Sequence, residues 1–111
     1  MQDGIYRVQL QAIGGIGSGL MIVSKCSLNG GDFGYTYQGH VQSTGNNIST
    51  KVHISRHDPT VHSVFGPLDN FDLDLSGTLS HGGHAFHLSG TVVSQPQLRI
   101  AITGRKVRAL V

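Results

Sequence analysis

The chain has 111 residues, of which 38% are hydrophobic and 13% are charged, and its formal net charge is +2. A chain of this length predicts a single domain, residues 1–111, with one buried core. The composition excludes the charge-rich pattern of disordered chains and the dense basic face of nucleic-acid binders. No stretch approaches the roughly 20 apolar residues of a membrane helix, so we expect neither a nucleic-acid nor a membrane partner.

The cysteine content points to a reducing compartment. Cys26 is the only cysteine, which excludes an intrachain disulfide. The apolar run at 20–23 is too short for the core of a signal peptide. We therefore expect a cytoplasmic protein. The strand beside Cys26 is apolar, so its thiol is expected to be buried or inert.

Apolar residues recur at every second position in the first half of the chain, which is typical of strands with one buried face. The expected strands here cover residues 6–12, 20–24, 26–29, 33–42 and 48–56. A glycine-rich turn at 14–19 separates the first two. In the second strand Leu20 and Ile22 are expected to face inward, and Met21 and Val23 outward.

Residues 30–39 combine a turn and an aromatic strand. The turn at 29–32 leads directly into a segment whose aromatic residues alternate. Phe33, Tyr35 and Tyr37 are therefore expected on one face of a strand, and that face needs an apolar interior.

The second half of the chain continues the same period. The expected strands cover residues 71–79, 85–93 and 97–103. Before them, residues 57–70 form the longest irregular connection, in which 61–65 are a candidate short strand. No segment has the 3.6-residue period of a helix, so we expect little or no helix.

About eight strands with one apolar face each predict an all-β fold, a small antiparallel up-and-down β-barrel. Closure turns the apolar face inward and removes the exposed sheet edges. Gly39, Gly77 and Gly90 fall within strands on the apolar face, where glycine eases sharp bending. A two-sheet sandwich is the structural alternative.

The barrel interior is the candidate ligand site. An eight-stranded barrel is either filled by its own side chains or holds one small ligand, and the sequence leaves both possibilities open. The residues expected to line this interior are Phe33, Tyr35, Tyr37, Phe71, Leu73, Phe86 and Leu88. On the outer face, an apolar cluster of Ile5, Met21 and Val23 is the candidate dimer patch.

The sequence indicates no catalytic or metal site. The histidines at 81, 84 and 87 do not converge on one point, as metal ligands must, and all seven histidines, His62 included, are expected at the surface. Asp72 and Asp74 belong to the outward face of a strand. The pair His57 and Asp58 has no serine in a strained G-x-S-x-G turn to activate. We expect no cofactor, no metal and no enzymatic activity.

Four short motifs carry a family resemblance: DGIY at 3–6, GSG at 17–19, GGD at 30–32 and YQG at 37–39. In their order and spacing they resemble the GrlR family, negative regulators of bacterial type III secretion. The resemblance implies a lipocalin-like β-barrel with an apolar interior that forms a homodimer. It also implies a regulator that inhibits a transcriptional activator by binding it, without catalysis.

The chain departs from the family pattern in one place. The family presents an acidic run after the YQG strand, whereas residues 43–47 here contain no acid. An acidic partner site at that loop is therefore not implied. The sequence favours a non-enzymatic regulator that acts by protein binding, and the alternative is a carrier or sensor of a small apolar ligand.

Overall fold

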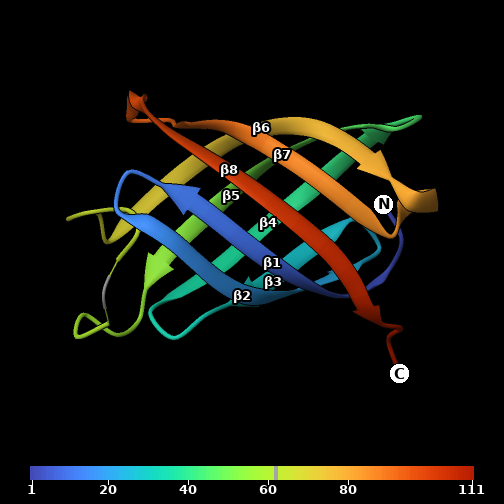
Figure 1. Cartoon of the computed structure of the whole chain (residues 1–111), viewed down its shortest axis with the longest axis horizontal. Helices are drawn as coiled ribbons and strands as arrows, with labels where there is room; N and C mark the ends of the chain where they lie inside the picture. The colour runs from blue at the N-terminus through green and yellow to red at the C-terminus, as the bar shows by residue number, and fades with distance from the viewer. Residues whose placement is uncertain (62) are drawn as a thin grey trace.

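The computed structural model describes residues 1–61 and 63–111, and within them eight strands close into an antiparallel barrel (Figure 1). The strands are β1 (Gly4–Ala12), β2 (Gly15–Ser24), β3 (Ser27–Gly31), β4 (Tyr35–Thr44), β5 (Asn47–Arg56), β6 (Asn70–Ser80), β7 (Ala85–Val92) and β8 (Gln95–Arg108). Each strand pairs with the next along the chain, and β8 pairs with β1. The expected all-β barrel is confirmed, and the sandwich alternative is wrong.

Helical structure is almost absent from the described residues. A single 3-10 turn, η1 (His81–Gly83), connects β6 to β7. No helix in this part of the chain is long and apolar enough to cross a membrane.

The core is the inner layer of the barrel. Six of the residues expected to face the interior are at most 5% exposed: Tyr35, Tyr37, Phe71, Leu73, Phe86 and Leu88. The loop between β5 and β6 adds Phe65, whose ring contacts those of Tyr35 and Phe71 and closes one end of the barrel. These inward positions follow the period-two pattern of the sequence.

The strands approach closely where glycine faces inward. A Cβ atom on Gly77 would lie 1.7 Å from the His87 carbonyl oxygen, and one on Gly90 would lie 1.9 Å from that of Asp74. No larger residue fits at such distances, so the backbone itself requires glycine here. The glycines thus permit close approach of neighbouring strands, and the expected easing of strand bending stays a prediction.

The face assignment of β2 was wrong. Tyr6 of β1 is fully buried, and Met21 lies directly opposite it in the register. Residues directly opposite each other share a face, so Met21 and Val23 point inward, 4% and 0% exposed. Leu20 and Ile22 instead point outward.

The turn lengths explain this error. Ala12 pairs with Gly15, so the first hairpin turns on two residues, Ile13 and Gly14, and the strand begins within the expected turn at 14–19. The next turn is equally short. Lys25 and Cys26 both have positive φ, 50° and 67°, which is the conformation of a two-residue type I′ turn. Cys26 is therefore exposed and not buried.

The connection between β5 and β6 has no strand in its described residues, so the candidate strand at 61–65 is not found there. His62 lies outside the described residues. Within the rest of the connection, the Tyr35 hydroxyl bonds the buried Ser63 hydroxyl and donates to the Leu68 carbonyl at 2.9 Å. These bonds fix the connection across the end of the barrel.

Candidate functional site

Asp32 organises the segment that joins β3 to β4. Its Oδ1 atom accepts hydrogen bonds from the backbone N–H groups of Gly34 and Tyr35, both at 2.8 Å. Its Oδ2 atom accepts a hydrogen bond from the Tyr37 hydroxyl. A carboxylate that accepts from its own following backbone forms an Asx turn, which holds the chain in a sharp bend.

The Tyr37 hydroxyl is a permanent donor in this arrangement. Burial raises the pKa of Tyr37 far above its ordinary value, and the hydrogen bond to Asp32 and its negative charge raise it further. The phenol therefore stays protonated at every physiological pH and keeps its bond to the carboxylate. The Asp32 bend is in this way tied directly to the barrel core.

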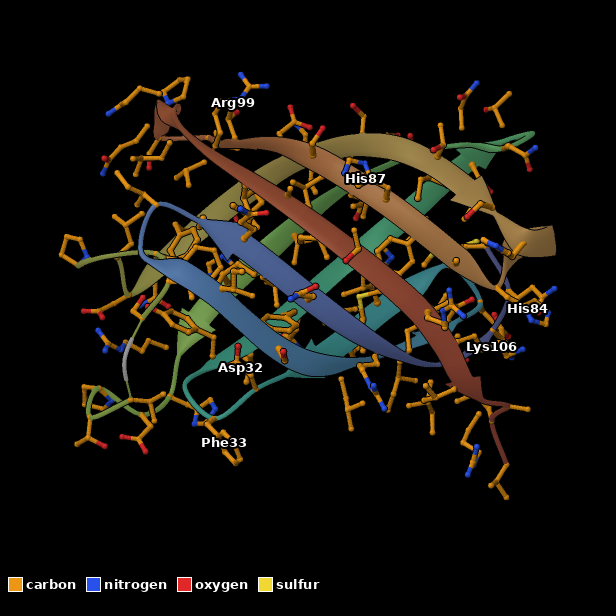
Figure 2. All side chains as sticks on the ribbon, in the orientation of Figure 1. Asp32, Phe33, His84, His87, Arg99 and Lys106 are labelled. Atoms are coloured by element: carbon orange, nitrogen blue, oxygen red, sulfur yellow. The ribbon has the colours of Figure 1, made fainter. Side chains whose placement is uncertain are left out.

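Phe33 sits at the tip of the bend and points away from the barrel (Figure 2). It is 87% exposed and precedes β4, so the expectation that it faces the interior with Tyr35 and Tyr37 is wrong. The two backbone bonds to Asp32 turn the chain before the strand begins, and the alternation therefore starts only at Tyr35.

Phe33 has apolar neighbours on the surface. It borders a hollow of about 160 Å³ together with Ile16, Val61 and Val64. We call these four residues the Phe33 patch. Ile16 is itself 61% exposed, so two large apolar side chains from different elements face solvent side by side.

The loop beside Phe33 is held by its own polar bonds. The Asp58 carboxylate accepts from the Thr60 hydroxyl at 2.6 Å and from its N–H at 3.0 Å. These bonds hold the pKa of Asp58 below its ordinary value. Arg56 donates to the Val61 carbonyl at 2.8 Å. The Phe33 patch is therefore built on fixed backbone on both sides.

The barrel interior is filled by side chains. The central void, which Tyr37, Phe86 and Leu88 help to line, has a volume of about 20 Å³, room for about one water molecule. In this conformation the interior gives no space to a small apolar ligand, and the ligand alternative stays a prediction without structural support.

A comparison with known protein families adds evidence on the role of this barrel. A family model described as "T3SS negative regulator, GrlR", where T3SS is the type III secretion system, matches residues 1–110. The chain belongs to the GrlR family. No curated protein matches it. The family match supports a role for the chain in the negative regulation of type III secretion.

In this GrlR-family chain the loop after the YQG motif is the β4–β5 hairpin. Residues 43–47 are exposed there and include no acid. The turn after the YQG motif is thus an exposed hairpin without an acidic side chain.

The candidate dimer patch needs correction in this GrlR-family barrel. Met21 and Val23 belong to the core, and only Ile5 lies on the outer face, half-buried. Its cross-strand neighbour is Ile22, 44% exposed, and Leu20 is 54% exposed. The outward apolar residues of β2 that lie near Ile5 are therefore Leu20 and Ile22. A prediction of a two-residue first turn would have assigned Leu20 and Ile22 to the outer face, because the turn length sets the register of the hairpin.

The histidines that the structure describes are dispersed over the barrel, as are the carboxylates. His53 Nδ1 lies 2.8 Å from Asp72 Oδ1 on the outer wall, with both side chains about half exposed or more. His57 Nε2 bonds the Asp32 carbonyl at 2.9 Å, so it does not orient a nucleophile. Asp74 also points outward, as expected. Among the described residues, no three His, Cys, Asp or Glu side chains gather as metal ligands would.

Proposed function

We propose that this chain is a non-enzymatic, cytoplasmic regulator that lowers type III secretion by binding a protein partner through the Phe33 patch. The observation that carries the proposal is the exposure of Phe33, 87%, beside the exposed Ile16. Large apolar side chains that gather at the surface mark sites of protein contact. Aromatic residues are also the most frequent anchors of such interfaces.

The rigidity of the patch supports this role. The Asp32 carboxylate fixes the backbone on both sides of Phe33, and Asp58 and Arg56 fix the facing loop. A backbone that is already held in place loses little freedom on binding, so more of the contact energy of Phe33 appears as affinity. The family match supports a protein partner in the regulation of type III secretion, and our proposal is that this partner is a transcriptional activator, as the resemblance of the sequence implies.

The non-enzymatic part of the proposal rests on where the reactive side chains lie. The His53–Asp72 pair stands on the convex outer wall and not in a cleft. Catalytic groups normally work in a concave site that excludes water. The packed interior, with its void of about 20 Å³, offers no such site either.

The homodimer stays a prediction. Its expected contact now rests on the cross-strand pair Ile5 and Ile22 on the outer face of β1 and β2. Light scattering on the purified protein measures its mass directly. The variant I22S should be monomeric if this pair forms the dimer contact, and an unchanged dimer would place the contact elsewhere.

A photo-crosslinker tests the proposed function. We would replace Phe33 by benzoylphenylalanine in cells that carry a type III secretion system, with the same replacement at Ser49, an outward residue of β5, as the control. The proposal expects position 33, and not position 49, to crosslink a regulator of that system. The variant Phe33→Ser should also release secretion from repression while its melting temperature is unchanged. Full repression by a folded Phe33→Ser variant would overturn the proposal.

A further inference from the structure

Two arginines stand side by side on the outer wall of the barrel. Arg7 of β1 lies directly opposite Arg105 of β8, and both side chains are exposed. Directly opposed residues of antiparallel strands have Cα atoms about 4.5–5.5 Å apart. Among the described residues, neither guanidinium has a hydrogen-bond or ion-pair partner. Like charges in this position repel each other, so the fold itself gains nothing from the pair.

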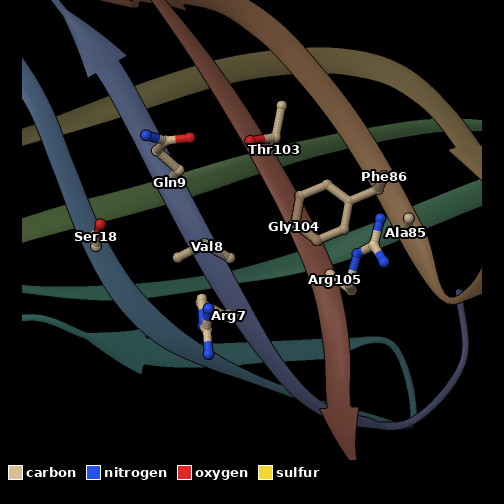
Figure 3. Close-up of a pocket in the computed structure, with 9 residues that line it drawn as sticks. All are labelled: Arg7, Val8, Gln9, Ser18, Ala85, Phe86, Thr103, Gly104 and Arg105. Atoms are coloured by element: carbon tan, nitrogen blue, oxygen red, sulfur yellow. The ribbon is translucent and has the colours of Figure 1, made fainter.

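The arginines border a wide hollow on the outer surface of the barrel. Its volume is about 530 Å³, and its lining residues come from β1, β2, β7 and β8 (Figure 3). Small residues, Ser18 on β2 and Ala85 on β7, flank the arginines and leave the space open. Gln9 and Thr103 form the next cross-strand pair and supply polar groups. We call the hollow and its lining residues the arginine groove.

The wall around the groove contains no acid. β1, β2, β7 and β8 include neither Asp nor Glu. The positive charge continues along β8 with Arg99 and Arg108, and His87 lies opposite Thr103. A cationic surface without internal counterions attracts negatively charged partners.

Apolar residues border the groove on one side. Leu20 lies directly opposite Arg7 on β2 and is 54% exposed, and Ile22 follows it. Ser18 lines both the arginine groove and the hollow of the Phe33 patch. The groove and the patch therefore form one continuous surface with a basic part and an apolar part.

We propose that the arginine groove binds an acidic, amphipathic segment of the partner protein, with its carboxylates on Arg7 and Arg105 and its apolar side chains on Leu20 and toward the Phe33 patch. This inference rests on the proposed function and adds the chemistry of the partner. Arginine binds carboxylates through two parallel hydrogen bonds.

Two other occupants fit the surface less well. A second copy of this chain, placed about a two-fold axis at the groove, would bring four arginines together and repel. Nucleic acid contacts require a denser array of cations along the backbone, and the exposed Leu20 and Ile22 would remain in contact with water. An acidic and partly apolar peptide satisfies both parts of the surface.

Fluorescence anisotropy with defined probes tests the proposal. The probes are labelled peptides of alternating glutamate and leucine, or of lysine and leucine, and a short DNA duplex. The wild-type chain should bind the glutamate peptide best, and the binding should weaken with added salt. The double variant R7Q/R105Q should bind that peptide about tenfold more weakly. The control K25Q/K51Q carries the same loss of charge on lysines outside the groove and should bind like the wild type.

The outcomes separate this inference from the proposed function. Equal binding of the glutamate peptide by R7Q/R105Q and the wild type, or tighter binding of DNA than of that peptide, would overturn the arginine groove. Such a result would leave the crosslink at position 33 and the loss of repression in Phe33→Ser unaffected. Conversely, peptide binding that depends on the arginines would stand even if position 33 crosslinked no regulator.

Discussion

The two sides of the barrel differ in how they use their charges. On the β4–β6 wall, His53 bonds Asp72 at 2.8 Å, Ser55 bonds Asn70 at 2.8 Å, and Lys51 lies directly opposite Asp74. On the opposite wall, formed by β1, β2, β7 and β8, Arg7 and Arg105 face each other. The first wall pairs several of its polar side chains within the fold, whereas Arg7 and Arg105 of the second wall have no partner among the described residues.

The inner layers of the two walls do not differ in this way. Leu73 and Leu75 of β6 and Val8 and Leu10 of β1 are all at most 2% exposed. The contrast is therefore confined to the outer face, where folding imposes the weakest demands. The arginine groove proposed above lies on the outer face of the second wall.

The largest expected effect on stability tests whether the inner layers of the two walls are equally closely packed. Gly77→Ala should cost about 3 kcal/mol of unfolding free energy, because the added Cβ meets the His87 carbonyl oxygen of the backbone. Gly104→Ala should cost only about 1 kcal/mol, because its Cβ meets the Phe86 ring, which can shift. Urea denaturation measures both, with the exposed Ser76→Ala as a control expected to be neutral. A larger loss in Gly104→Ala would contradict this view of the core.

The next largest effect on stability concerns Tyr37, whose hydroxyl holds the Asp32 bend between β3 and β4. Its pKa is raised in the folded state, so above about pH 10 the unfolded chain loses this proton while the folded chain keeps it. The unfolded state then binds fewer protons, and stability falls by about 1.4 kcal/mol per pH unit. Below pH 10 this contribution is fully present.

The variant Tyr37→Phe isolates this contribution. Its unfolding free energy, measured by urea denaturation between neutral and alkaline pH, should fall less steeply above pH 10 than that of the wild type. The slope should not vanish, because burial also raises the pKa of Tyr6. Equal slopes in the two proteins would show that Tyr37 is not held protonated by the fold.

The smallest expected effects on stability compare charged residues on the outer faces of the two walls. Asp72→Asn should cost about 0.5 kcal/mol, because it breaks an exposed pair with His53. Arg7→Gln should cost nothing and should raise stability by about 0.3 kcal/mol at low salt, because it removes a like-charge contact. Thermal melts at low and high salt measure both. A clear loss of stability in Arg7→Gln would mean that the second wall also uses its charges for folding.

The sequence predicted the barrel and most of its core because both depend on the period-two pattern alone. Tyr35, Phe71 and Phe86 face inward for this reason. The period-two pattern gave the wrong face where local hydrogen bonds or turn lengths determine the direction of a side chain. The hydrogen bonds to Asp32 turn Phe33 outward. The two-residue turn before β2 sets a register in which Met21 points inward, opposite to the predicted face.

The arginine groove depends on a different kind of information. Arg7 and Arg105 lie in the first and last strands, 98 positions apart in the sequence numbering (105 − 7). They meet only because β8 closes on β1 in one particular register. Alternation within a strand predicts that each points outward, but it does not predict which residues become neighbours across the closure.

The most direct test of the whole account is the amount of type III secretion in cells that make matched variants of this chain. The triple variant R7Q/F33S/R105Q removes both parts of the proposed surface, and K25Q/K51Q removes the same charge elsewhere. The account predicts that the triple variant loses repression at wild-type protein levels while K25Q/K51Q represses fully. Full repression by the triple variant, or an equal loss in both, would contradict it.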